Sequence, residues 1–172
     1  MKKILVLFGI ALSLTFCSMN FAYCEESVEL LETITNIGTL VAIDEKYDEA
    51  LEKCNKALEK YPDNAELYSW RATVLNRKGK NLEALADIDK AIELDPDDLS
   101  YHVTRGSCMF DLGNVSAALE ECNYVIGKDP KESSAYALRA VIRMQRMDLS
   151  GASEDLDRVN KLLDEEIESL NK

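Results

Sequence analysis

The stretch that decides the fold is Ala65–Asp98, which reads AELYSWRATVLNRKGKNLEALADIDKAIELDPDD. Two segments within it, Ala65–Lys78 and Leu82–Glu93, carry apolar residues three and four positions apart, which is the spacing of one face of an α-helix. Gly79 favours the end of the first helix, because glycine tolerates the positive φ found at helix C-termini. Pro96 cannot continue the hydrogen-bond ladder of the second. The stretch therefore predicts two helices joined by a short turn.

The same pattern recurs along the chain at one fixed interval. The positions that share a phase are three prolines (Pro62, Pro96 and Pro130), four alanines (Ala50, Ala84, Ala118 and Ala152) and four small residues (Gly38, Ala72, Gly106 and Ala140). A fixed period of about 34 residues is typical of helical repeat arrays. It divides the chain into four units: Leu31–Asn64, Ala65–Asp98, Leu99–Glu132 and Ser133–Glu166.

The recurring small residues have a mechanical explanation. Where two helices cross closely, a side chain that ends at Cβ lets the two backbones approach, and a larger one overpacks the contact at a cost of roughly 1–3 kcal/mol. We therefore expect Ala84 and Ala118 to be almost fully buried.

From about Leu31 to Glu166 the chain resembles the tetratricopeptide repeat (TPR) family at these prolines, alanines and small residues. The family's aromatic positions are only partly kept, since Tyr68 and Tyr136 match one of them whereas the corresponding residues Ile34 and His102 do not. The resemblance implies an all-α fold, a right-handed α-solenoid of four TPR helix hairpins with a C-terminal capping extension. We expect this TPR domain to occupy residues 25–172.

The fourth unit departs from the pattern at both of its ends. Met147 replaces the turn glycine and Asp164 replaces the closing proline, so we expect the last helix to run on, with residues 167–172 as its end. Its apolar residues form one stripe, which we expect to belong to a cap on the array: Ala152, Leu156, Val159, Leu163, Ile167 and Leu170.

Residues 1–24 have the order of a secretory signal peptide. Lys2 and Lys3 form a basic start, an apolar run follows from Ile4 to Phe16, and small and polar residues lead to Cys24. Uncleaved, Ile4–Tyr23 is close in length to the ~20 residues that a membrane span needs. We expect an exported protein, either periplasmic or secreted, or held at a membrane by this segment if it is not cleaved.

The composition excludes several function classes. The formal net charge of -12 disfavours a nucleic-acid partner, because a polyanion is repelled from most of such a surface. A single histidine makes most metal and triad chemistries hard to assemble. With no phosphate-cradling glycine loop and no pairing of nucleophile and base, we expect no enzyme activity, no metal and no cofactor.

Charged residues also follow the period. Arg71, Arg105 and Arg139 share one phase, and each of them is followed at one constant spacing by an acid: Asp87, Glu121 and Asp155. Folding a hairpin about its turn brings the two phases to similar heights, so we expect three partly buried structural ion pairs. The other interpretation is a row of arginines that binds an anionic ligand.

Three cysteines follow the expected cleavage site: Cys54, Cys108 and Cys122. Export permits disulfides, and Cys108 and Cys122 flank the turn of the third unit at comparable distances, so a bridge between them is geometrically reasonable. The alternative is that both are buried free thiols that act as small apolar residues.

In the TPR proteins that this chain resembles, the first helix of each unit lines a concave face that holds partners. The corresponding positions predict partner-binding residues at Ser69, Thr73, Asn76, Arg77, Val103, Ser107, Phe110, Val141 and Met144. The apolar members, Val103, Phe110, Val141 and Met144, form a patch of a kind that monomeric proteins seldom expose without use. The alternative is that the C-terminal helix folds over this patch.

The resemblance and the composition together favour an exported TPR adaptor, a protein-binding module that grips a peptide or helix, preferably a basic one. The alternative is a structural subunit, self-associating or membrane-anchored, in an envelope assembly. The oligomeric state is left open by the sequence.

Overall fold

The computed structural model of the chain describes residues 27–43 and 45–170, so the expected signal peptide or anchor lies outside the described residues. In this part of the chain all regular structure is helical. A helix over residues 27–42 is followed by α2 (Tyr47–Lys60), α3 (Ala65–Arg77), α4 (Asn81–Leu94), α5 (Leu99–Asp111), α6 (Val115–Lys128), α7 (Ser133–Gln145) and α8 (Leu149–Leu170).

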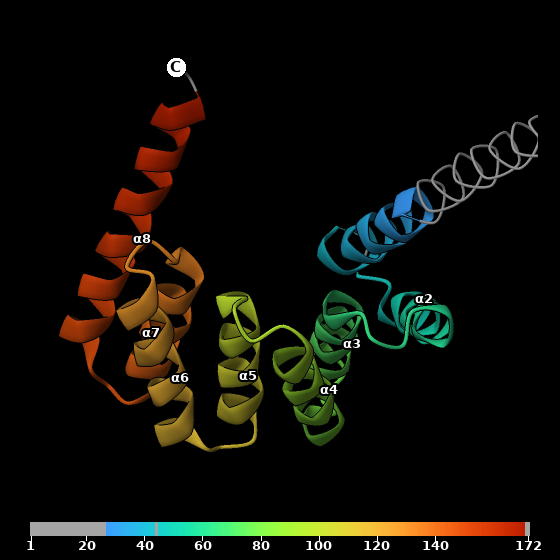
Figure 1. Cartoon of the computed structure of the whole chain (residues 1–172). Coiled ribbons are helices and arrows are strands. Elements are labelled where there is room, and N and C mark those ends of the chain that lie inside the picture. Colours follow the sequence, from blue (N-terminus) through green and yellow to red (C-terminus); the bar gives the residue numbers. More distant parts are fainter. Residues whose placement is uncertain (1–26, 44, 171–172) are drawn as a thin grey trace, which may run out of the picture.

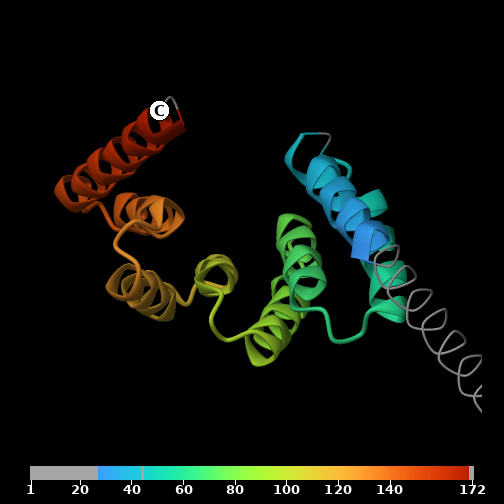
Figure 2. The same ribbon diagram turned by 45° about the horizontal axis from the view of Figure 1, so that its top comes forward.

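Consecutive helices pack side by side and form a curved array, as the views in Figures 1 and 2 show. Each helix from α2 onward contacts the next one in the chain, and the closest packing occurs within the hairpins α3–α4, α5–α6 and α7–α8. These hairpins correspond to the second, third and fourth units expected from the repeat period, and α8 extends four residues beyond the fourth. The fold is therefore an all-α solenoid of helix hairpins.

The first helices of adjacent hairpins also touch one another. α3 contacts α5 and α5 contacts α7, whereas α4 and α6 do not approach each other. Because the first helices lie closer together than the second helices, they form the inner side of the curve. Any groove along the array is therefore lined by α3, α5 and α7.

The helix ends follow local chemistry. The Asn64 side chain caps α3 by accepting a hydrogen bond from the Leu67 backbone at 2.8 Å, and Asp98 caps α5 through the Ser100 backbone at 2.9 Å. The turns of the second and third hairpins have glycines in the left-handed region, Gly79 with φ of 74° and Gly113 with φ of 81°.

Met147 adopts the same left-handed conformation in the fourth hairpin, with φ of 61°. For a residue with a Cβ this conformation costs roughly 1–2 kcal/mol. The turn is kept because the hairpin on both sides of it is packed, so methionine in place of glycine stores strain without changing the path of the chain.

The small residues lie where the hairpins cross. Ala50, Ala84 and Ala118 are 0% exposed and Ala152 is 3% exposed, so the expectation for Ala84 and Ala118 is confirmed. A Cβ placed on Gly106 would lie 3.2 Å from Glu121 Cβ and 3.2 Å from a methyl of Leu138. These contacts show how closely α5 approaches both α6 and α7.

The last helix continues to Leu170, as the missing proline predicted, but of the expected stripe only Ala152 is among its buried residues. Its buried residues are Gly151, Ala152, Asp155 and Leu162, which lie against α7, the one labelled helix that α8 contacts. Most of the expected stripe is in solvent: Leu156, Leu163, Ile167 and Leu170 are 42% to 80% exposed. Asp155 lies on the face of α8 that packs on α7, where it pairs with Arg139 and Arg143.

In the described ranges, no helix combines the length and the apolar character needed to cross a bilayer.

Candidate partner-binding groove

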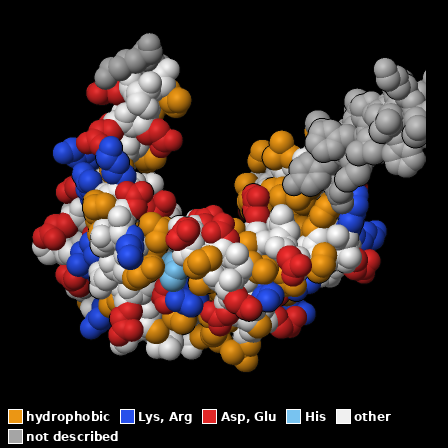
Figure 3. All heavy atoms as spheres, in the orientation of Figure 1, with side chains coloured by type: hydrophobic (Ala, Val, Ile, Leu, Met, Phe, Trp, Pro, Cys, Tyr) orange, Lys and Arg blue, Asp and Glu red, His pale blue; other side chains and the backbone are white. Residues whose placement is uncertain are grey.

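A groove runs along the inner side of the array between α3, α5 and α7. It has a volume of about 570 Å³ and is lined by Thr73, Asn76, Arg77, Val103, Thr104, Ser107, Phe110, Asp111, Leu138 and Val141. Figure 3 shows the surface hollowed between α8 and the helix over residues 27–42. An open groove of this kind suits an extended chain or a helix better than a small molecule, which is usually enclosed.

Most of the residues expected from the sequence line this groove. The structure brings together seven of them: Thr73, Asn76, Arg77, Val103, Ser107, Phe110 and Val141. Ser69 lines an adjoining cavity, nearer the start of α3. Met144 is 41% exposed but does not line the groove, because it lies one turn beyond Val141 on α7.

The two sides of this groove differ in polarity, and the side formed by α5 and α7 is apolar. Val103, Phe110, Leu138 and Val141 form an apolar wall from α5 and α7, and Val141 is 46% exposed. The expected alternative, in which the C-terminal helix folds over this wall, does not occur, since α8 contacts α7 but not α5. The wall is therefore open to an apolar group of a partner.

Polar groups of α3 face the other side of the groove. Asn76 donates to Asp111 Oδ2 at 2.7 Å and thereby links α3 to α5 across the floor. The hydroxyl of Thr73 donates to the Ser69 carbonyl in its own helix at 3.0 Å. These bonds fix the side chains that a partner would meet, so its binding requires little reordering of the groove.

The adjoining cavity is larger, about 800 Å³, and lies between the starts of α3 and α5. Four carboxylates line it, Asp63, Glu66, Asp95 and Asp98, together with Trp70 and Tyr101, and no lysine or arginine is among its lining residues. Sequence reasoning did not assign the four acids to the site. Three of them, Asp63, Asp95 and Asp98, lie in the loops between units and therefore outside the helical spacing used to find the groove.

Trp70 is held in place from the side of the first unit. A Cβ on Gly38 would lie 3.3 Å from two atoms of the Trp70 ring, so the small residue makes room for the indole. Trp70 is half-buried and also lines the acidic cavity. An aromatic face beside several carboxylates favours a cationic group.

The arginines of the repeat do not line the groove. Each pairs with the acid of its own hairpin: Arg71 with Asp87 at 2.6 Å, Arg105 with Glu121 at 2.8 Å and Arg139 with Asp155 at 2.6 Å. Hydrogen bonds to Asp87 and Asp155 raise the pKa values of Arg71 and Arg139 above the ordinary value for arginine. The pairs connect the two helices of each hairpin, so this row has a structural role.

Each arginine also reaches back to the preceding hairpin. Its Nη1 donates to a polar side chain on the second helix of the unit before: Asn55 at 3.0 Å, Asp89 at 3.3 Å and Asn123 at 2.7 Å. These three residues were not identified from the sequence, although they recur once in each unit, as the arginines do. The row therefore joins adjacent units as well as adjacent helices.

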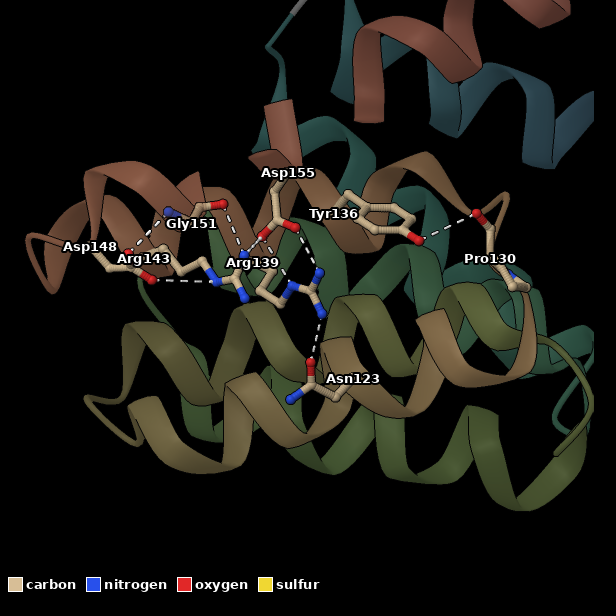
Figure 4. Close-up of polar contacts among 8 residues, drawn as sticks. All are labelled: Asn123, Pro130, Tyr136, Arg139, Arg143, Asp148, Gly151 and Asp155. Carbon is tan, nitrogen blue, oxygen red and sulfur yellow. Dashed lines mark hydrogen bonds and ion pairs between the residues drawn. The ribbon is translucent and has the colours of Figure 1, made fainter. Parts of the chain in front are cut away.

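The network is densest in the last hairpin (Figure 4). Asp155 accepts from Arg139 on one side and from Arg143 Nη1 on the other at 2.9 Å, and Arg143 Nη1 also donates to the Gly151 carbonyl at 2.9 Å. Tyr136 donates to the Pro130 carbonyl at 3.4 Å, and the Arg139 guanidinium carbon lies 5.4 Å from the centre of the Tyr136 ring.

His102 replaces an aromatic residue of the repeat and is 8% exposed. Its Nδ1 lies 2.8 Å from Glu121 Oε2, and its ring centre lies 4.6 Å from that of Tyr124. The imidazole thus shares the carboxylate of Glu121 with Arg105 and contributes to the packing of α5 on α6.

The cysteines form no disulfide in the described part of the chain. Cys54, Cys108 and Cys122 are free and 0% exposed, so the bridge that the sequence left open between Cys108 and Cys122 is absent. The two thiols pack in different clusters: Cys108 faces Ala72, Ala84 and Tyr101, and Cys122 faces Ile142 of the following unit. Burial raises the pKa of each, to about 12 for Cys54 and about 11 for the other two.

Comparison with known proteins gives one family. The family model described as tetratricopeptide repeat matches residues 44–98 and 77–133, which together span more than half of the 172 residues. A search of curated proteins by sequence finds no match.

Solved structures share the fold at low sequence identity. A thermophilic TPR protein of Thermus thermophilus is 18% identical with a TM-score of 0.72, covering 78% of this chain and 75% of that one. MamA of Desulfovibrio magneticus is 16% identical with a TM-score of 0.63, covering 79% and 76%. The first TPR domain of the human RPAP3 protein is 22% identical with a TM-score of 0.58, covering 77% and 95%. At these identities the likeness shows the fold alone.

Proposed function

The chain belongs to the tetratricopeptide repeat family, and we propose that it is an exported adaptor that holds a peptide or helix of a partner protein between α3, α5 and α7, without catalysing a reaction. The family fold supports a role in protein–protein interaction. The observation that carries the finer proposal is the groove itself, which is open, is built from fixed side chains and is not covered by the C-terminal helix.

The chemistry of the groove supports a partner segment that is basic at one end and apolar at the other. A lysine or arginine of the partner would lie against Trp70 among the carboxylates of Asp63 and Glu66. Apolar side chains of the same segment would pack on Phe110 and Val141. The net charge of -12 also favours association with a basic partner, and this attraction weakens as salt increases.

Export is supported by the N-terminal pattern of Lys2, Lys3 and the apolar run from Ile4 to Phe16. Cell fractionation followed by N-terminal sequencing tests it. A chain that is found outside the cytoplasm and begins near residue 25 supports cleavage. An exported chain that still begins at Met1 indicates an anchor, and a cytoplasmic chain contradicts export.

A random peptide library displayed on phage tests the groove. We expect selection on the wild-type chain to enrich peptides in which a lysine or arginine precedes apolar residues. Val141→Asp should lower the affinity for the selected peptides by at least about tenfold. Glu66→Lys should also lower this affinity and should make it less dependent on salt concentration.

Two variants on the outer side of the array serve as controls. Leu82 is 73% exposed on α4, and Glu120 is exposed on α6, so Leu82→Asp and Glu120→Lys make the same chemical changes away from the groove. Both should bind like the wild type. Selected peptides that bind all four variants equally would show that the groove is not the binding site.

A further inference from the structure

α8 exposes an apolar seam that the array does not use. Leu149, Leu156, Leu163 and Leu170 recur at intervals of seven residues and are 64%, 42%, 45% and 80% exposed. An isolated helix has no reason to keep a seven-residue period, because a straight helix drifts by about 20° per heptad relative to it. A strict heptad of leucines is typical of a helix that winds around another helix.

The positions between the leucines complete a heptad pattern. Ser153, Asn160 and Ile167 each follow a leucine by four residues and precede the next by three, which places leucine at every d position and these three residues at the a positions. All three are exposed. Ile at a with Leu at d favours two strands, and an asparagine at a specifies register at some cost in stability.

The seam is accessible on the folded protein. The residues of α8 that bury against α7 are Gly151, Ala152, Asp155 and Leu162, none of which is an a or d residue of the heptad. Figures 1 and 2 both show the distal part of α8 extending beyond the other helices of the array. A second helix can therefore approach the seam without displacing α7.

The charges beside the seam are compatible with pairing between two copies of α8 in parallel orientation. The g positions are Ala152, Val159 and Glu166, and the e positions are Ser150, Asp157 and Asp164. In a parallel pair each g residue faces the e residue of the next heptad on the other chain, so Val159 faces Asp164 and no like charges meet, while Ala152 is already packed on α7. An antiparallel pair would instead place the aspartates at e opposite one another.

We infer that α8 is a dimerisation helix, which pairs through its leucines with α8 of a second copy of this chain in a parallel two-stranded coiled coil. In this register Asn160 meets Asn160, and the two amides satisfy each other as donor and acceptor. Two polar a positions make the pair a reversible one. None of the seam residues lines the groove, so the dimer does not depend on the proposed adaptor function.

Sedimentation equilibrium of the full chain tests the inference. We expect a reversible dimer at micromolar concentrations, and Leu170→Asp should weaken it by at least about 100-fold, because a charge would be placed in the seam. Ser169→Asp adds the same charge one residue away on another face and should leave the dimer unchanged. A monomer at all concentrations, or a dimer equally insensitive to both changes, would overturn the inference.

Asn160→Ile tests the register of the coiled coil, because it should strengthen the dimer. It replaces the polar a residue by a β-branched one, so association should strengthen by about tenfold or more while the fold of the array is unchanged. Weaker or unaltered association would contradict the placement of Asn160 in the seam.

Cross-linking tests the parallel orientation. In a chain with Cys17 and Cys24 changed to serine, Leu170→Cys should form a disulfide-linked dimer under mild oxidation, whereas the matched Ser169→Cys should not. In an antiparallel pair the two ends of α8 would lie about 30 Å apart, so Leu170→Cys would not cross-link. That outcome would overturn the parallel arrangement.

Discussion

Arg139 holds the carboxylate of Asp155 with two hydrogen bonds, from Nε at 3.0 Å and from Nη2 at 2.6 Å, and the Asp155 side chain is only 3% exposed. Arg143 contacts the same carboxylate from the next turn of α7 at 2.9 Å. The charges of Arg139 and Arg143 are thus both compensated by the one buried carboxylate of Asp155. These three side chains join α7 to α8 in the last hairpin.

Asp155→Ala should therefore destabilise the protein strongly. It leaves Arg139 and Arg143 partly buried without their carboxylate, and the loss of one partner from a buried pair costs about 3–5 kcal/mol. Asp157→Ala, at an exposed position two residues along α8, should stay within about 0.5 kcal/mol of the wild type. Urea unfolding followed by circular dichroism measures both, and equal effects would show that the network contributes little.

Met147→Gly should stabilise the protein. Met147 has φ of 61°, and replacing it by glycine relieves a strain of roughly 1–2 kcal/mol, part of which is offset by the greater freedom of glycine in the unfolded chain. The reverse change, Gly113→Met, should destabilise the corresponding turn, since Gly113 has φ of 81°. Thermal unfolding checks the pair, and a lower Tm for Met147→Gly would contradict the assignment of strain to this turn.

Ala84→Leu should destabilise the array at the contact between hairpins. Ala84 is 0% exposed and packs in one cluster with Ala72, Ile88 and Tyr101, so a longer side chain has no room and costs about 1–3 kcal/mol. Ala86→Leu introduces the same side chain on the exposed face of α4 and should have almost no effect. If the free energies of unfolding of the two variants agree, the close approach of the helices at Ala84 is not needed.

The buried thiols predict a loss of stability in alkali. Burial raises the pKa of Cys122 from 9.0 to about 11, so the folded state keeps this proton when the unfolded state has lost it. The stabilising contribution is complete below pH 9 and is lost between pH 9 and about 11, by up to about 1.4 kcal/mol for each pH unit.

Cys122→Ala removes this contribution and should make the free energy of unfolding less dependent on pH across that window. Val125→Ala, also fully buried on α6, creates a comparable cavity without a titrating group. It should lower stability equally at every pH. If both variants keep the slope of the wild type, another group is responsible for it.

Much of the fold could be predicted from residues that act locally. Gly79 and Pro96 mark helix ends because of their own backbone chemistry, and Ala84 and Ala118 mark the crossing of helices because they recur at one phase of the repeat. The pairing of Arg71 with Asp87 followed from the same argument, since a hairpin of fixed length brings their two phases to one height.

The groove was predicted only in part. Helical spacing found Phe110 and Val141, which lie on the first helices, but it could not find Asp63 or Asp95, which enter the adjoining cavity from loops. Met144 was also assigned by spacing; it is exposed but lies one turn beyond Val141 on α7, outside the residues that line the groove. The missed residues depend on how far neighbouring hairpins rotate against each other, and no single unit contains that information.

The sequence by itself determined the repeat, the helix hairpins and the partner of each arginine within its own hairpin, because these follow from helix geometry over a few turns. Only the tertiary structure decided that Arg139 also reaches Asn123, that Cys108 and Cys122 face different neighbours, and that the heptad leucines of α8 are exposed to solvent. The physical reason is that the angle between successive hairpins is set by the sum of many small side-chain contacts between units. That sum is a property of the assembled array, whereas the period is already present in the chain.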